Sequence, residues 1–382
     1  MPEVLANKQI KAIAFYLPQF HSIPENDRAW GEGFTEWTNM KKAKPLFEDH
    51  NQPRVPLNKN YYNLLESDTQ IWQSELAMKY GVYGFCYYHY WFKDGKKLLE
   101  KPLENMLNDK KIKIPFCISW ANENWSKRWD GGNQELIAEQ DYGNKDDWEK
   151  HFLYLYEFFK DERYITLNGK PILLIYKPGE IPCLTEMLDY FDCLAKGKGL
   201  KGICFMIQNP TYYFGYEFNW GRFDYLVNFE PFFTYDYMRL GPTKTRLKHM
   251  AYRVAKYIGV QKEFLSLLKK KRAAEETQLE KWDYDTFWNN IIRRRTEKRM
   301  ISGAFVDWDN TPRKANGKVF LGVSPEKFGK YMSCLVDKIK TTRQTPIVFI
   351  NAWNEWCEGA YLEPDEKNQY QNLEELNKAL KE

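Results

Sequence analysis

Eight short apolar runs recur along the 382-residue chain, and segments with helical spacing separate most of them. Runs this short and this apolar are typical of parallel strands that are buried on both faces. Strands that alternate with helices favour a (β/α)8 barrel of the TIM type with long βα loops, formed by residues 1–382 as one domain. The strands are expected at residues 12–17, 84–88, 114–119, 172–176, 202–207, 225–230, 303–309 and from 347 onward.

Other α/β architectures and other compartments are disfavoured. No G-x-G-x-x-G motif follows the first strand, and neither a Walker A sequence nor a Gly-x-Ser-x-Gly elbow is present. No run is long and apolar enough to span a bilayer, and the N-terminus lacks the apolar core of a signal peptide. The seven cysteines are odd in number and form no C-x-x-C pair, which favours reduced thiols and a cytoplasmic protein.

One segment departs from the pattern. Residues 235–300, between the sixth and seventh strands, are expected to form a basic, mostly helical insertion; residues 239–299 carry a net charge of +10, against +4 for the whole chain. Such a low total charge does not suggest a nucleic-acid-binding protein. An apolar stripe in the insertion either packs on the barrel or docks on an anionic surface, such as phospholipid or a lipid-linked glycan. The stripe consists of Leu247, Met250, Ala251, Val254, Tyr257 and Ile258.

The last apolar run ends in an acidic and aromatic sequence. Residues 347–359 begin as Ile-Val-Phe-Ile and continue as Asn-Ala-Trp-Asn-Glu-Trp-Cys-Glu-Gly. In an α/β barrel, the residues that follow the strands form the active site. Glu355 and Glu358 are flanked by Trp353 and Trp356, and two carboxylates beside flat apolar surfaces suit acid/base chemistry on a sugar. The alternative is a helix cap followed by a solvated turn.

Polar and aromatic residues also gather after other strands. Aromatic residues make up 17% of the chain, more than packing usually requires, and Trp and Tyr rings suit stacking on sugars. His89 is equally compatible with fixing a loop, and the histidines show no metal-ligand spacing, so neither a metal nor a cofactor is expected. The predicted substrate-binding residues are Tyr16, Gln19, Glu36, Trp37, Tyr88, His89, Tyr90, Trp91, Trp120, Asn122, Glu123, Trp125, Trp129, Asp307, Asp309, Arg313, Trp353, Asn354 and Trp356.

Several motifs together resemble one family. The sequence at 353–359, with its continuation to Asp365, resembles the C-terminal signature of WbsX-type proteins, also called glycoside hydrolase family 99-like. The resemblance implies a (β/α)8 barrel and kinship with endo-acting α-mannosidases that retain anomeric configuration. Cys357 departs from those enzymes, which often carry His there, so the identity of the sugar stays open. Further matching motifs lie at residues 14–21, 30–37, 87–92, 120–125 and 309–313.

The resemblance also implies roles for the two glutamates. Glu355 is the base that takes the proton from the sugar 2-hydroxyl, whose oxygen attacks the anomeric carbon and forms a 1,2-anhydro sugar. Glu358 protonates the leaving oxygen and then activates water. Glu358 must therefore stay protonated at neutral pH, through burial or through the charge of Glu355. The implied substrate is an oligosaccharide or polysaccharide with an α-linked, mannoside-like bond, in bacterial surface polysaccharide or lipopolysaccharide metabolism.

Three alternatives stay open. Asn122-Glu123 matches the acid/base signature of many retaining barrel glycosidases, in which Glu355 would be the nucleophile at about 5 Å. Asp307-Trp308-Asp309 resembles the D-x-D motif by which nucleotide-sugar glycosyltransferases hold a divalent metal. These carboxylates and Arg313 are also suited to hold sugar hydroxyls or one another. The third alternative is a glycan-binding barrel without catalysis.

Overall fold

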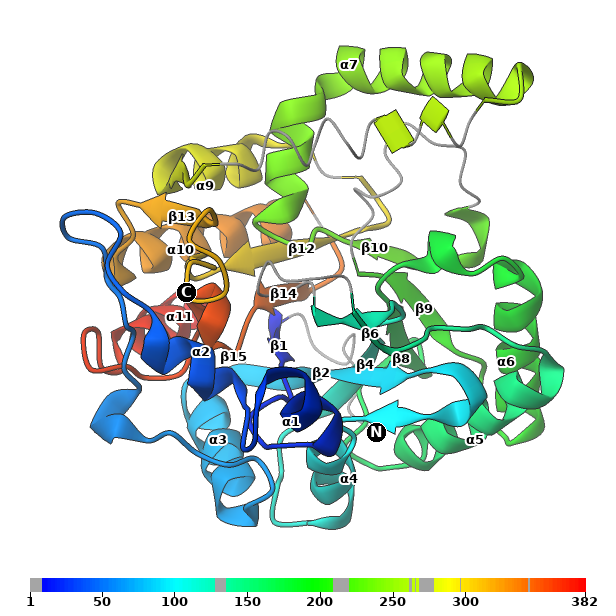
Figure 1. The fold of residues 1–382 in the computed structure, drawn as a ribbon, viewed down its shortest axis with the longest axis horizontal. Helices are drawn as coiled ribbons and strands as arrows, with labels where there is room; N and C mark the ends of the chain where they lie inside the picture. Colours follow the sequence, from blue (N-terminus) through cyan, green and yellow to red (C-terminus); the bar gives the residue numbers. More distant parts are fainter. Residues whose placement is uncertain are drawn as a thin grey trace.

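Parallel strands form a closed barrel at the centre of the molecule (Figure 1). The computed structural model describes residues 9–127, 135–208, 220–260, 263–264, 266–267, 278–295, 297–342 and 344–382. The parallel pairing runs β1-β14-β12-β10-β9-β8-β4-β2, and β2 pairs again with β1, which closes the ring. The barrel strands are β1 Lys11–Tyr16, β2 Val82–Trp91, β4 Phe116–Trp120, β8 Lys170–Ile175, β9 Cys204–Ile207, β10 Tyr225–Val227, β12 Met300–Phe305 and β14 Ile347–Asn351. The predicted (β/α)8 fold is confirmed, since all eight expected runs overlap these strands.

The barrel interior is filled by side chains of several strands. Phe15 of β1 stacks on Tyr88 of β2, with ring centroids 5.7 Å apart. The same ring contacts Phe349 of β14 at 5.4 Å and Phe229, just after β10, at 5.2 Å. Every residue of β4, β9 and β14 is buried, as expected for parallel strands with side chains in the barrel on one face and under helices on the other.

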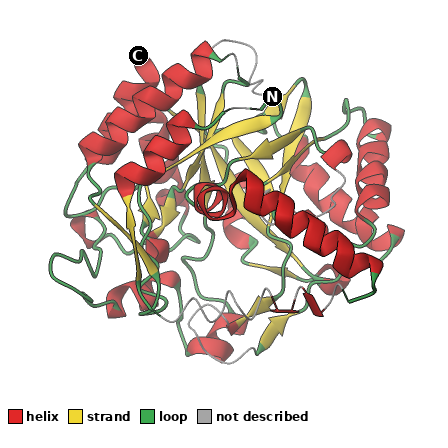
Figure 2. Ribbon diagram, turned by 90° about the horizontal axis from the view of Figure 1, so that it is seen from above, coloured by secondary structure: helices red, strands yellow, loops and turns green. Residues whose placement is uncertain are grey.

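Helices surround the barrel (Figure 2). In α5 the buried residues Trp148, Phe152, Leu155 and Phe159 recur at helical spacing and face the core. Asn144 caps the N-terminus of α5 by accepting a hydrogen bond from the amide of Asp146. The surrounding helices are α3 Ser67–Lys79, α4 Lys101–Asn108, α5 Lys145–Phe159, α6 Leu184–Gly197, α9 Tyr284–Arg293, α10 Pro325–Thr341 and α11 Gln371–Lys381.

Long βα loops extend the end of the barrel at which the strands terminate. The loop after β1 contains α1 Pro24–Trp30 and α2 Glu36–Lys42. Between β10 and β12, where the helical insertion is expected, the chain leaves the barrel as α7 Phe232–Tyr257 and returns through β11 Glu280–Asp283 and α9 (Figure 1). The remaining short strands are β3 Lys97–Leu98, β5 Trp125–Ser126, β6 Leu136–Ala138, β7 Thr166–Leu167, β13 Lys318–Leu321, β15 Asn354–Glu355 and β16 Ala360–Tyr361.

Two further features concern the cysteines and the helices. All seven cysteines lie among the described residues, and each is a free thiol. No helix in the described part of the chain combines the length and the apolar character that crossing a bilayer requires.

Candidate active site

A tight hairpin follows β14. Strand β15 pairs with the antiparallel β16, and a single 3-10 turn, η8 (Trp356–Glu358), joins them. Gly359 closes the turn at φ 63°, in the left-handed region that favours glycine. A Cβ atom on Gly359 would lie only 2.9 Å from the backbone nitrogen of Asp309. The hairpin therefore holds Glu355 and Glu358 at the carboxyl end of β14, where barrel enzymes carry catalytic groups.

The two tryptophans of the motif support this hairpin from inside the protein. Trp356 stacks on Tyr361 with ring centroids 3.8 Å apart, and its Nε1 donates a hydrogen bond of 2.7 Å to Glu363. Trp353 packs against Phe85 at 5.1 Å. Both indoles are completely buried, so neither presents a face on which a sugar ring can stack.

A guanidinium joins the two glutamates to a third carboxylate. Arg313, in the loop after β12, forms an ion pair with Glu358 and lies 3.0 Å from Glu36 and 3.6 Å from Glu355. Glu36 is the first residue of α2, and its carbonyl accepts a hydrogen bond from the Cys357 thiol at 3.0 Å. Three carboxyl groups thus contact one guanidinium. Among the three glutamates, Glu358 has the most exposed side chain, at 21%.

This crowding sets the protonation of the cluster. Burial raises the pKa of Glu355 well above its ordinary value, and the charge on Glu358 raises it further. Burial also raises the pKa of Glu358, but the Arg313 guanidinium opposes this rise. Carboxylates that crowd around one cation are costly to ionise together. Burial and the Glu358 charge therefore favour the protonated form of Glu355, whereas the ion pair with Arg313 favours the ionised form of Glu358.

Two tyrosines from the second barrel strand face the same cluster. Tyr88 and Tyr90 leave the same side of β2, because side chains alternate along a strand. Burial raises the pKa of both phenols, and the negative charge on Glu355 adds to the rise. The Tyr90 hydroxyl accepts a hydrogen bond of 3.0 Å from Gln19. The cluster therefore combines Gln19, Glu36, Tyr88, Tyr90, Arg313, Glu355 and Glu358, all of which were predicted site residues.

One member of this polar layer was missed. The Gln208 amide directly follows β9, donates to the Tyr88 hydroxyl at 3.0 Å and accepts a hydrogen bond of 2.5 Å from Ser119. Gln208 is the first polar residue after an apolar run, so the rule applied to the other strand ends would have found it.

His89, Trp91 and Trp120 lie elsewhere. His89 and Trp91 point from the opposite side of β2 toward helix α5, where the His89 and His151 Nε2 atoms are 3.0 Å apart and the Trp91 ring stacks on His151 at 4.6 Å. Trp120 packs edge-on against the same imidazole at 4.6 Å. Burial lowers the pKa of His89 to about 3, which keeps it neutral. These side chains join barrel and helix, and none of them belongs to the glutamate cluster.

Two predicted amides tie strand ends together. Asn354 accepts a hydrogen bond of 2.8 Å from the backbone nitrogen of Leu17 and donates one of 3.0 Å to its carbonyl. Asn122 makes the same pair of bonds to the backbone of Lys177, at 2.7 and 2.8 Å. Each amide makes the pair of backbone hydrogen bonds that a neighbouring strand would otherwise make. The polar groups of both side chains are therefore used within the protein.

Glu123 lies apart from Glu355. Its side chain is 41% exposed and forms an ion pair with Lys177, just beyond the end of β8. The charged groups that shift the pKa of Glu355 are Glu358, Arg313 and Glu36. The electrostatic partner of Glu355 is thus Glu358, which argues against Glu123 as its catalytic counterpart.

Three further aromatic residues from the predicted set are buried. Tyr16, Trp37 and Trp125 use their donor groups within the protein. The acceptors are Gln73 Oε1 at 2.6 Å, the Tyr62 carbonyl at 2.8 Å and Asn26 Oδ1 at 3.3 Å, respectively. Trp129 lies outside the described residues.

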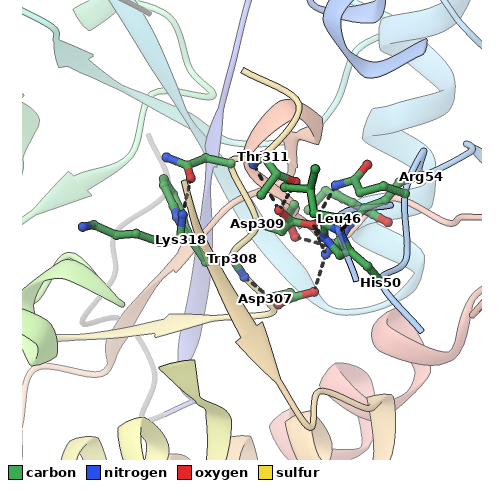
Figure 3. Close-up of polar contacts among 12 residues, drawn as sticks. Leu46, His50, Arg54, Asp307, Trp308, Asp309, Thr311 and Lys318 are labelled. Carbon is green, nitrogen blue, oxygen red and sulfur yellow. Dashed lines mark hydrogen bonds and ion pairs between the residues drawn. The ribbon is translucent and has the colours of Figure 1, made fainter. Parts of the chain in front are cut away.

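Asp307 and Asp309 face a cation of the protein (Figure 3). Arg54 Nη2 lies 2.7 Å from Asp307 and 3.6 Å from Asp309, and His50 and Gln52 bond to Asp309 at 2.9 and 2.7 Å. Both carboxylates contact the same guanidinium, so Arg54 supplies the positive charge that a metal would bring. The described residues contain no group of three or more His, Cys, Asp or Glu placed to hold a metal ion.

Asp309 and Arg54 also support the turn that carries Glu358. The Asp309 amide donates a hydrogen bond of 2.6 Å to the Glu358 carbonyl, and Arg54 Nη1 donates one of 3.3 Å to the Gly359 carbonyl. The D-x-D motif therefore acts on the hairpin from behind and does not join the glutamate cluster.

Two solved structures share this fold over nearly the whole chain. A glycoside hydrolase-like protein aligns with a TM-score of 0.54 and 10% identity, covering 98% of this chain and 94% of its own. The GH99 endo-alpha-mannosidase from Bacteroides thetaiotaomicron aligns with a TM-score of 0.51 and 11% identity, covering 98% and 97%. At such identities the likeness concerns the fold.

Sequence comparison gives the family. Two uncharacterized WxcX proteins from strains of Xanthomonas campestris pv. campestris are 33% identical over 380 and 374 residues, which is 96% of this chain. The chain spans about half the length of these curated relatives, 49% in each case. The family model described as glycosyltransferase WbsX matches residues 12–376. With a match of that extent, the chain belongs to the WbsX family.

Proposed function

We propose that the chain is a glycoside hydrolase that cleaves internal bonds of an α-linked, mannoside-like glycan. The reaction retains the anomeric configuration, and the glycan belongs to bacterial surface polysaccharide or lipopolysaccharide metabolism. The observation that carries this proposal is the pair Glu355 and Glu358 on one turn at the carboxyl end of β14. The barrel shared with a GH99 endo-alpha-mannosidase supports it. So do the phenols of Tyr88 and Tyr90, which keep their protons and can donate to sugar hydroxyls.

The reaction has two steps. Glu355 takes the proton of the sugar 2-hydroxyl while that oxygen bonds to the anomeric carbon, and Glu358 gives its proton to the departing glycosidic oxygen. The product of this step is a 1,2-anhydro sugar. In the second step Glu358 takes a proton from water as the water oxygen attacks the anomeric carbon, the bond between that carbon and the 2-oxygen breaks, and Glu355 returns its proton to the 2-oxygen. Two inversions give net retention.

The position of Glu355 suits its role. Its Oε2 is buried and has no hydrogen-bond partner among the described residues, with Arg313 Nη2 at 3.6 Å. A buried oxygen without a partner is costly, so a donor placed there by the substrate is favoured. The 2-hydroxyl of a bound sugar is such a donor.

The ion pair with Arg313 opposes the protonation that the first step requires of Glu358. Arg313 favours the ionised form of Glu358, whereas the first step requires Glu358 to be protonated. Substrate binding must therefore separate Arg313 from Glu358 or move the proton across the pair. Glu36, at 3.0 Å from Arg313, is the partner that can retain the guanidinium when Glu358 is released.

The test is a set of three isosteric variants assayed on α-linked mannose-containing oligosaccharides. Glu355→Gln and Glu358→Gln should each lower kcat/KM by a factor of about 1,000 or more, since each removes a proton-transfer group. Glu123→Gln is the matched control and should stay within about tenfold of wild type, because Glu123 is exposed and paired with Lys177. The anomer formed first, read by NMR, should be the retained one.

Full activity in either of the first two variants would end this assignment. If Glu123→Gln were as inactive as Glu355→Gln while Glu358→Gln stayed active, Glu123 would be the acid/base.

A second candidate is a nucleotide-sugar glycosyltransferase, because the family model carries that description. This function predicts that a nucleoside diphosphate with Mn²⁺ raises the melting temperature through Asp307 and Asp309. Both carboxylates are already paired with Arg54, so we expect no such shift. A shift of several degrees that Asp307→Asn abolishes would favour the transferase.

We also propose that the protein acts in the cytoplasm. The free state of all seven cysteines supports a reducing compartment. Fractionation of the producing cells tests this: a periplasmic or extracellular pool would contradict it.

A further inference from the structure

The outer part of α7, with the residue that follows its last turn, presents an apolar stripe to solvent. Leu247, Met250, Val254, Tyr257 and Ile258 are exposed by between 55% and 92%. Their spacing of three and four residues puts them on one face of the helix. Of the two alternatives for this stripe, packing on the barrel is therefore wrong for these five side chains.

The root of α7 is firmly attached. Phe233 is buried, and the Arg294 guanidinium lies over its ring at 4.4 Å. Tyr235 stacks on Trp282 of β11 at 4.8 Å. Beyond this root the helix changes direction and runs along the edge of the molecule (Figure 1). Pro242 lies within the helix, and an internal proline removes a backbone hydrogen bond and bends a helix.

The charge of this part of the chain has one sign. Between Arg239 and Lys262 the sequence contains seven Lys or Arg residues and no Asp or Glu. A helix with an apolar face and an exclusively basic complement is typical of segments that lie in the interface of an anionic membrane. A surface that binds a protein partner of ordinary composition does not need to lack every acidic residue. The absence of Asp and Glu from this segment therefore favours a membrane over a protein partner.

The helix also emerges at the catalytic end of the barrel. It begins shortly after β10 ends at Val227, and the returning strand β11 pairs with β13, which follows β12. Both attachments therefore lie at the end where the strands terminate, which is the end that holds Glu355 and Glu358.

We propose that the exposed face of α7 docks on an anionic lipid bilayer, with the helix parallel to the membrane plane. The five apolar side chains enter the boundary between headgroups and acyl chains, and the positive charge of this part of the sequence favours anionic lipids. Docking turns the catalytic end of the barrel toward the membrane, where glycans attached to lipids are presented. This inference does not depend on the glycosidase assignment.

The test is flotation of the full chain with two kinds of vesicle, pure phosphatidylcholine and the same lipid with about a third phosphatidylglycerol. The wild type should bind the anionic vesicles, release them in high salt and ignore the neutral ones. Met250→Asp with Val254→Asp should weaken binding by about tenfold or more, since two acidic groups replace apolar contacts. The matched control is Leu65→Asp with Leu153→Asp, two exposed positions elsewhere, and it should bind as the wild type does.

Circular dichroism and thermal melting establish that both double variants are folded. Failure of the wild type to bind anionic vesicles overturns the proposal, as does equal binding by the Met250/Val254 variant. A wild type that is dimeric on size-exclusion chromatography, becomes monomeric with the Met250/Val254 pair and ignores vesicles would instead assign the face to self-association. Hydrolysis of a soluble oligosaccharide should be unchanged in both double variants, which separates this proposal from the proposed activity.

Discussion

At the scale of single residues, Arg313 decides the charge state of the site. It contacts the carboxyl groups of Glu36, Glu355 and Glu358, and of the two glutamates on the hairpin only Glu358 forms a close ion pair with it. Glu36 is 277 residues away in the sequence, yet it binds the same guanidinium. Arg313 thus favours the ionised form of Glu358, against the burial that raises the pKa of this carboxyl, and losing the contact would raise that pKa further.

Replacing Arg313 should therefore move the pH profile. In Arg313→Gln the pKa of Glu358 rises, so the protonated acid persists to higher pH and the alkaline limb of kcat/KM shifts upward by about 1–3 pH units. Lys314→Gln is the control: Lys314 also lowers the pKa of Glu358, but more weakly, so the limb should move in the same direction and less far. An unchanged or downward-shifted limb in Arg313→Gln would mean that Glu358 is not the acid.

At the scale of elements, the hairpin of β15 and β16 depends on its turn. Gly359 adopts a left-handed conformation, and its α-carbon faces the Asp309 amide and the Arg54 guanidinium at distances that leave no room for a methyl group. The hairpin is thereby fixed to Asp309 and Arg54, and Asp309 lies on the loop that carries Arg313. The hairpin that carries Glu355 and Glu358 is therefore held in a fixed position relative to the loop that carries Arg313.

A comparison of Gly359→Ala with Gly33→Ala separates the cost of backbone strain from the cost of steric contact at this turn. Both glycines have positive φ, 63° and 73°, but a Cβ atom on Gly33 would meet nothing within 4 Å. Gly33→Ala should cost about 1 kcal/mol of unfolding free energy, from backbone strain alone. Gly359→Ala should cost about 2–4 kcal/mol, because neighbours must also move. Guanidinium denaturation measures both, and equal losses would show that contact with Asp309 and Arg54 is unimportant.

At the scale of the whole molecule, buried contacts hold the helix layer on the barrel. The pair of His89 on β2 and His151 on α5 is one of them. Burial lowers the pKa of both imidazoles, to about 3 for His89, so both are neutral in the folded protein. The unfolded chain takes up protons near pH 6.5, and the folded protein does not, so acid favours unfolding.

Unfolding free energy should consequently fall as the pH drops below about 6.5, by about 1.4 kcal/mol per pH unit for each buried histidine. For His89 this loss continues until its folded pKa is reached, at about 3. The double variant His89→Phe, His151→Phe should show a shallower decline between about pH 7.5 and 5. Denaturation curves at both pH values give the difference, and the packing change cancels because it is present at each pH. Parallel declines in the two proteins would contradict the neutral pair.

The sequence by itself determined the ring of strands and the place of the acids. Each strand is a local apolar run, and Glu355 and Glu358 share one turn, so neither inference needs a distant contact. Only the tertiary structure decided which side chains meet. Closure of the barrel through β1 brings Glu36 from the first loop to Arg313 from the seventh, and gives Asp307 and Asp309 to Arg54. His89 and Trp91 lie on the outer face of β2 because side chains alternate along a strand. Trp353 and Trp356 are buried and therefore cannot contact a ligand. The sequence did not show either outcome, because a strand's local pattern does not say which face a neighbouring element will cover.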